Sequence, residues 1–160
     1  MSFCPARFHC GFSEWGFFYT IMAIKRRKLK GGARAWTKRI DPPFHRYIRL
    51  RDTNEHGYGK CCTCDKEIHF HDGDAGHFIP RQHKATRWNE ENVNFQCKYC
   101  NQWEGGAQYA YSKHLGEDKA DELVRLSRTI YKLSDAEFED IYYHYKELVE
   151  ELEKNKDFLK

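Results

Sequence analysis

Two close pairs of cysteines are the part of the sequence best suited to binding a metal. Cys61 and Cys64 form one Cys-x-x-Cys pair, and Cys97 and Cys100 form a second pair further along. Two such pairs are typical of a tetrahedral zinc site, with Zn–S distances of about 2.3 Å. Four thiolates leave no open coordination position, so we predict a structural Zn²⁺. Disulfides or redox dithiols are the alternatives, although seven cysteines cannot all pair within one chain.

Polar side chains suited to phosphodiester hydrolysis lie between and directly after the cysteine pairs. Asp74, His77 and Asn92 lie between them, and Asn101 and Glu104 follow the second pair. If a helix begins at that pair, Asn101 and Glu104 share one of its faces. Such oxygen ligands suit a hard divalent ion, and a neutral histidine can deprotonate the attacking water. The cluster therefore predicts metal-assisted hydrolysis of a phosphodiester.

The order of these residues resembles the HNH, or ββα-metal, endonucleases, and more closely the phage NinG/Rap family of recombination endonucleases. The stretch from Cys100 to Gly105 is also similar to the phage resolvase endonuclease VII. The resemblance implies an α+β fold, in which a small zinc-stabilised ββα-metal finger is followed by a C-terminal helical region. It also implies a Mg²⁺- or Mn²⁺-dependent endonuclease whose partner is branched DNA, of the Holliday-junction or D-loop type. The matching text is Cys61-x-x-Cys64, Asp74-Ala-Gly-His77-Phe-Ile and Asn92-Val-Asn-Phe-Gln-Cys97-x-x-Cys100-Asn101.

The same resemblance implies roles for individual residues. His77 would be the general base, and Asn92 would hold the loop after it through hydrogen bonds to the backbone. Asn101 would be a ligand of the catalytic metal ion, and Glu104 would be a second acid near that ion.

One position departs from the family pattern. Many relatives have an acidic metal ligand immediately before the histidine, where this chain has Gly76. Asp74 is the nearest candidate for that missing ligand. Asparagine rather than histidine at position 101 suits a hard ion and argues against catalytic zinc.

Positive charge is concentrated in one segment. Residues 25–51 contain eleven lysines and arginines against a single acidic residue, Asp41. We predict that residues 25–59 form a basic DNA-binding arm, with a solvated arm that binds nothing as the alternative. The interleaved Trp36, Phe44 and Tyr47 are expected to stack on bases. The candidate DNA-binding residues are Lys25, Arg26, Arg27, Lys28, Arg34, Lys38, Arg39, Arg81, Lys84 and Arg87.

The C-terminal part is acidic and predicted to be helical. Residues 116–160 contain thirteen acidic and eight basic side chains. Apolar side chains recur every three or four residues over 123–133 and 138–152, which predicts two amphipathic helices. Ser134 and Glu137 between them match a capping box. The partner of these narrow apolar stripes is the other helix, the central core or a second copy of the chain, so homodimerisation is an alternative to core packing.

These features divide the chain into residues 1–24, the arm at 25–59, a zinc-stabilised nuclease finger at 60–115 and the two-helix tail at 116–160. Residues 1–24 are either an extension ahead of a native start at Met22 or a short accessory element packed on the body. They lack a basic stretch before the apolar run and an A-x-A-like cleavage site, so we do not expect a secretory signal, and their apolar stretch is too short to cross a bilayer. We therefore expect a protein of the bacterial cytoplasm, if it is phage or prophage encoded, with no membrane partner.

Three functions remain in competition. The first is a structure-specific endonuclease, the second a non-catalytic zinc module that binds DNA, and the third a sequence-specific HNH endonuclease. A binding module needs the cysteines and basic residues, but it has no need of Asp74, His77, Asn101 and Glu104 together around one turn. We therefore favour the structure-specific enzyme.

Overall fold

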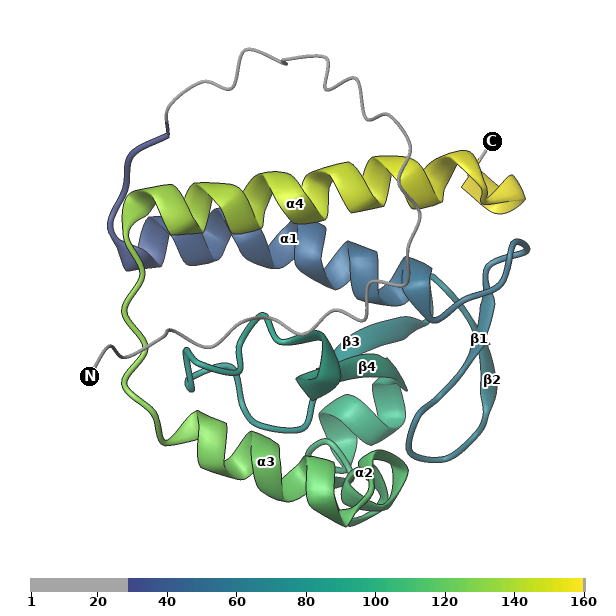
Figure 1. The fold of residues 1–160 in the computed structure, drawn as a ribbon. Coiled ribbons are helices and arrows are strands. Elements are labelled where there is room, and N and C mark those ends of the chain that lie inside the picture. Colours follow the sequence, from purple (N-terminus) through teal and green to yellow (C-terminus); the bar gives the residue numbers. More distant parts are fainter. Residues whose placement is uncertain (1–28, 160) are drawn as a thin grey trace, which may run out of the picture.

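A computed structural model describes residues 29–159, in which a pair of long helices covers a small strand region (Figure 1). Two shorter helices lie on the other side of the strands in this view. Mixed helices and small sheets confirm the α+β class. The helices are α1 (Ala33–Arg51), α2 (Gln108–Leu115), α3 (Glu117–Ser127) and α4 (Asp135–Lys154), with single turns η1 (Glu90–Asn92), η2 (Tyr99–Trp103) and η3 (Asp157–Leu159). The strands are β1 (Tyr58–Lys60), β2 (Glu67–His69), β3 (Gly73–His77) and β4 (Val93–Cys97).

The strands form two small antiparallel sheets. β1 pairs with β2, and β3 pairs with β4 in a register that sets Gly73 opposite Cys97 and His77 opposite Val93. The turn η2 follows β4 almost directly, so the chain runs strand, strand, helix through the predicted site. Within residues 29–159, no helix is both long and apolar enough to cross a membrane.

Most of the segment predicted as a basic arm is the helix α1, and one face of that helix is buried. Its apolar side chains recur at every fourth position, which aligns them on one side while the basic residues occupy the others. Trp36 and Phe44 belong to this stripe, so the prediction that they stack on nucleic-acid bases is wrong. The completely buried members of the stripe are Trp36, Ile40, Phe44 and Ile48.

The partner of the buried face of α1 is α4. The rings of Trp36 and Phe138 stack with 5.8 Å between their centroids, and Phe44 meets Tyr145 edge-on at 4.8 Å. The indole Nε1 of Trp36 also donates to Asp135 Oδ1 at 2.6 Å. Packing within the chain therefore covers much of the apolar stripe of α4, and homodimerisation stays a prediction.

Both helices predicted in the acidic C-terminal region are present, as α3 and α4. The predicted capping box is confirmed, because Ser134 Oγ accepts from the Glu137 N–H and the Glu137 carboxylate accepts from the Ser134 N–H. Ile130, counted in the first apolar stripe, lies beyond the end of α3 and is 90% exposed. The first helix is thus shorter than its apolar pattern predicted.

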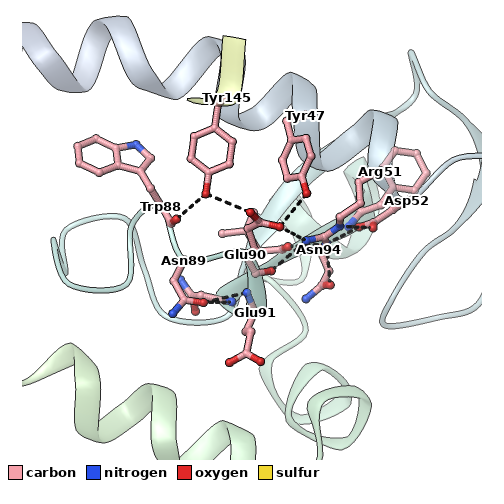
Figure 2. A network of polar contacts seen from close by, with 12 residues as sticks. Tyr47, Arg51, Asp52, Trp88, Asn89, Glu90, Glu91, Asn94 and Tyr145 are labelled. Carbon is pink, nitrogen blue, oxygen red and sulfur yellow. Dashed lines mark hydrogen bonds and ion pairs between the residues drawn. The ribbon is translucent and has the colours of Figure 1, made fainter. Parts of the chain in front are cut away.

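A polar network fixes the turn before β4 to the two long helices (Figure 2). The Tyr47 hydroxyl donates to Glu90 Oε2 at 2.8 Å, and the Tyr145 hydroxyl lies 3.4 Å from Glu90 Oε1. Arg51 donates to the Glu90 carbonyl at 3.2 Å and to the Asn94 side chain at the same distance. These contacts set the position of β4, and through it β3, relative to α1.

Candidate active site and metal centre

The four predicted zinc ligands come together at one end of the β3–β4 pair. Their Sγ atoms all lie within 4.8 Å of one another, and those of Cys64 and Cys97 are 3.9 Å apart. A tetrahedral zinc ion with bonds of about 2.3 Å holds its sulfur ligands about 3.8 Å apart. The cluster of Cys61, Cys64, Cys97 and Cys100 therefore has the spacing and chemistry to hold a zinc ion.

Hydrogen bonds favour the thiolate form of Cys61. Burial raises the pKa of this thiol, but the backbone N–H of Cys97 and the nearby Thr63 hydroxyl lower it more, to about 6. The thiolate is the form that binds metals. Burial raises the pKa of Cys64 and Cys100, so an ion would have to displace the protons of those two thiols on binding. A zinc ion there would join the segment after β1 to the end of β4.

A pocket of about 530 Å³ collects polar side chains from three elements. Asp74 Oδ2 accepts hydrogen bonds from Asn101 Nδ2 at 2.9 Å and from Gln102 Nε2 at 2.8 Å. The two predicted ligands of the catalytic metal, Asp74 and Asn101, are thus adjacent. A flip of the Asn101 amide would present its oxygen to an ion held by Asp74. The residues that line the pocket are His45 and Arg49 of α1, Asp74 and Ala75 of β3, Arg81, and Asn101 and Gln102 of η2.

Asn92 is completely buried and bonds to the loop that follows β3. Its Oδ1 accepts from the Ile79 N–H at 2.7 Å, and its Nδ2 donates to the carbonyls of Ile79 and Thr86 at 3.0 and 2.9 Å. These are bonds of the kind expected for a residue that holds the His77 loop. The role of Asn92 in catalysis remains a prediction.

His77 lies at the end of β3, largely buried beside α1. Its Nε2 is 3.1 Å from the carbonyl of Arg87, whereas Nδ1 has no hydrogen-bond partner among residues 29–159. Burial, helped by the neighbouring His45 and Arg81, lowers the pKa of His77 to about 4, so the ring is neutral at pH 7. If Nε2 donates to the carbonyl, Nδ1 keeps the lone pair that a general base needs.

The imidazole that lines the pocket is that of His45, which the sequence analysis missed together with Arg49. The His45 and His77 rings meet edge-on with 5.4 Å between their centroids. Burial, with Arg81 nearby, lowers the pKa of His45 to about 4. The available signal was the four-residue spacing of His45 and Arg49, which sets both on one face if residues 33–51 are helical.

Two predicted site residues are placed differently from expectation. Glu104 is exposed at the C-terminal end of η2 and is not among the residues that line the pocket. Arg87 donates to both carboxylate oxygens of Asp41, at 3.0 and 2.5 Å. This two-pronged ion pair occupies the guanidinium, so the structure does not support phosphate binding by Arg87.

The other candidate DNA-binding residues vary in how open they are to a ligand. The Arg39 guanidinium lies 5.0 Å from the centroid of the Trp36 ring and donates to the Lys30 carbonyl, so it is partly engaged. Lys25, Arg26, Arg27 and Lys28 fall outside the described residues. The exposed candidates are Arg34, Lys38, Arg81 and Lys84.

Comparison with known proteins gives one result. A family model described as "Bacteriophage Lambda NinG protein" matches residues 20–156, which include both long helices, the cysteine cluster and the pocket. No curated protein and no solved structure matches the chain.

Proposed function

Because the chain belongs to the NinG family, we propose that it is a metal-dependent DNA endonuclease that cuts branched recombination intermediates. Family membership suggests a recombination-related function in phage. The observation that carries the proposal is the pocket in which Asp74 meets Asn101 at 2.9 Å, with His45, Arg49 and Arg81 on its walls.

This pocket contains side chains that can hold a metal ion and side chains that can bind a phosphate, and phosphodiester hydrolysis needs both. The Asp74 carboxylate and the Asn101 amide suit a hard divalent ion such as Mg²⁺ or Mn²⁺. When bound, such an ion stabilises charge on the phosphate and on the leaving oxygen. Arg49 and Arg81 attract the phosphate, and neutral His77 would accept a proton from the attacking water.

The local order of elements supports an HNH-type finger. β3 and β4 form an antiparallel pair, and η2 follows with Asn101 facing the Asp74 carboxylate. Buried Asn92 ties the loop between the strands to the base of β4. The cysteine cluster would fix the other end of β4 to the segment after β1.

Exposed aromatic rings beside the pocket support distorted DNA as the substrate. Tyr99 and Trp103 flank Asn101 on η2 and are 62% and 82% exposed. Tyr109 at the start of α2 is 74% exposed, with the Lys113 ammonium 4.4 Å from the centre of its ring. Unpaired bases at a branch point can stack on such rings, whereas the bases of a continuous duplex have no free face.

One observation favours the second candidate, a non-catalytic zinc module. His77 does not line the pocket, so its contact with a substrate would require the side chains around it to rearrange. A module that only binds DNA would need the cysteine cluster and the exposed basic residues, and it would leave the polar pocket without a use.

The decisive experiment compares cleavage of four-way, flapped and linear DNA of matched sequence, with and without Mg²⁺. We expect Mg²⁺-dependent cuts in the branched molecules and little cleavage of linear duplex. Asp74→Asn should abolish cleavage, whereas Asp72→Asn, which changes an exposed neighbour before β3, should not. Binding without cleavage would favour the zinc module, and cutting of linear DNA at one sequence would favour a sequence-specific enzyme.

A further inference from the structure

We propose that His45 and Arg49 on α1 form a phosphate-binding site for the DNA backbone, outside the cysteine, aspartate, histidine and asparagine motif. This inference rests on the proposed nuclease function, because the ligand is a phosphodiester group held next to Asp74. It assigns to α1 a part in substrate binding as well as in the core.

The surface of α1 next to its buried stripe faces the loop and strand of the site. Asp41, His45 and Arg49 follow one another at four-residue intervals, so they lie along one side of the helix. Asp41 is neutralised by its ion pair with Arg87. His45 and Arg49 instead line the pocket that contains Asp74. Two of the three polar positions on this side are therefore available to a ligand.

His45, which lines the pocket, has an unused polar atom. Its Nε2 is buried and has no hydrogen-bond partner among the described residues. Buried polar side-chain atoms in folded proteins nearly always have a partner, so an unpaired one needs an explanation. A phosphate oxygen accepting from Nε2–H would supply the missing partner.

Arg49 has donors to spare in the same place. Its guanidinium lies 4.4 Å from the centre of the Phe70 ring, which orients the plane of the group. The hydrogen bonds it donates, to the carbonyls of His45 and Phe70, are long at 3.4 and 3.5 Å. A planar guanidinium held in this way matches two oxygens of a phosphate.

The other side chains of the pocket identify the anion as a phosphodiester with a divalent cation. Arg81 adds a third basic group, while Asp74 and Asn101 offer oxygens to a cation. A carboxylate ligand would use the basic groups and be repelled by Asp74. A phosphate that shares an ion with Asp74 satisfies both sets of side chains.

The test uses the full-length chain and measures two quantities separately. Affinity for a four-way junction is measured by fluorescence anisotropy in Ca²⁺ over a range of salt concentrations, and cleavage by the single-turnover rate in Mg²⁺. The variants are Arg49→Met, which keeps the apolar stem over Phe70, Arg49→Lys and His45→Gln. Arg125→Met on α3 is the matched control, because it removes an exposed charge away from the pocket.

We expect Arg49→Met to weaken junction affinity about tenfold and to lower the slope of log affinity against log salt by about one, as loss of one phosphate contact should. Arg49→Lys should restore the slope and part of the affinity. His45→Gln should slow cleavage of bound DNA about tenfold, the effect of one lost hydrogen bond to a charged group. Arg125→Met should stay within about twofold of the parent protein.

The outcomes separate this inference from the proposed function. If the parent protein binds junctions but never cuts them, the nuclease proposal fails. The affinity and salt slope of Arg49→Met would still show whether the phosphate site exists. If Arg49→Met and His45→Gln bind and cut like Arg125→Met, the phosphate site is refuted. A lower melting temperature with unchanged affinity and salt slope would also refute it, because the two side chains would then be only structural.

Discussion

The His77 ring has one nitrogen near a backbone carbonyl and one with no hydrogen-bond partner in the described part of the chain, as a proton acceptor requires. We predict that His77→Ala abolishes cleavage of branched DNA and changes junction affinity by less than about threefold, because a general base acts mainly in the transition state. Single-turnover cleavage and anisotropy measure the two effects. His77→Gln, which can still bond to the Arg87 carbonyl, controls for the cavity left by alanine. Cleavage at the parental rate by both variants would show that His77 is not the base.

Asn92 is predicted to be a stabilising residue as much as a functional one. Asn92→Ala would leave the buried N–H and carbonyl of Ile79 without these partners, at a cost of about 1–3 kcal/mol for each, while the Thr86 carbonyl would keep its bond from the Asn89 N–H. We expect the free energy of unfolding in urea to fall by about 2 kcal/mol or more. Asn94→Ala, two residues further on in β4 and half-buried, should cost less. Equal losses in the two variants would contradict a special role for the Asn92 bonds.

At the level of elements, the cysteine cluster accounts for a large part of a small core. Within residues 29–159, the other buried side chains in the cluster with Cys61, Cys97 and Cys100 are those of Ile68 and Phe95. We predict that one zinc ion is bound per chain and that chelation loosens β1, β2 and η2 before α1 and α4, because binding free energy is folding free energy here. Metal analysis and amide hydrogen exchange measure both effects.

The matched control for the zinc prediction is Cys62→Ser. Cys62 lies outside the cluster, so this variant should keep its zinc, whereas Cys64→Ser should lose it. Zinc-free protein with an intact fold, or an oxidised Cys61–Cys64 pair, would overturn the assignment.

Helices could be predicted from the sequence where apolar and charged residues follow a regular helical spacing. The C-terminal helices follow from their apolar spacing and from the Ser134–Glu137 box. The helix α1 was not predicted because eleven basic residues dominate the segment 25–51 that contains it. They hide the apolar stripe, which has a four-residue period. Pro42 and Pro43 also lie inside this helix, although proline lacks the N–H that a helix interior uses. Burial against α4 outweighs these local costs. The local sequence of α1 does not reveal that α4 will pack on it.

At the scale of the whole molecule, the burial of α1 changes how DNA binding must be tested. Deleting residues up to Arg51 would remove half of the buried residues in the cluster that joins α1 to α4 and the strands, so loss of binding would be uninformative. Replacing exposed Arg34 and Lys38 with alanine leaves the buried stripe intact. We predict weaker binding to all DNA sequences alike and a salt slope reduced by up to about two, since each phosphate contact contributes about 0.9. An unchanged slope would show that this surface does not touch DNA.

The candidate site is likewise only half predictable from the sequence. Asp74, Asn101 and the cysteines lie within one motif. Pairing of β3 with β4 gathers Asp74, Asn101, Cys97 and Cys100, and the bond from the Cys62 N–H to the Phe95 carbonyl adds the segment of Cys61 and Cys64. His45 and Arg49 reach the pocket only because α4 and the Glu90 network hold α1 against the strands. Their contribution depends on tertiary packing across the length of the chain, which motif spacing does not encode.

The pairing of the first described helix with the last one has a consequence for protein synthesis. α1 leaves the ribosome well before Asp135, where α4 begins, and chains grow at about 5–20 residues per second. For several seconds the apolar side of α1 therefore lacks α4, although Ala75 and Val93, which also pack on it, have been made and the cysteine cluster is complete from Cys100 onward and can already take up zinc. The nascent chain would pass through a stage with an ordered metal-bound centre and a helix only partly covered, which is the stage at which chaperone binding or aggregation competes with folding.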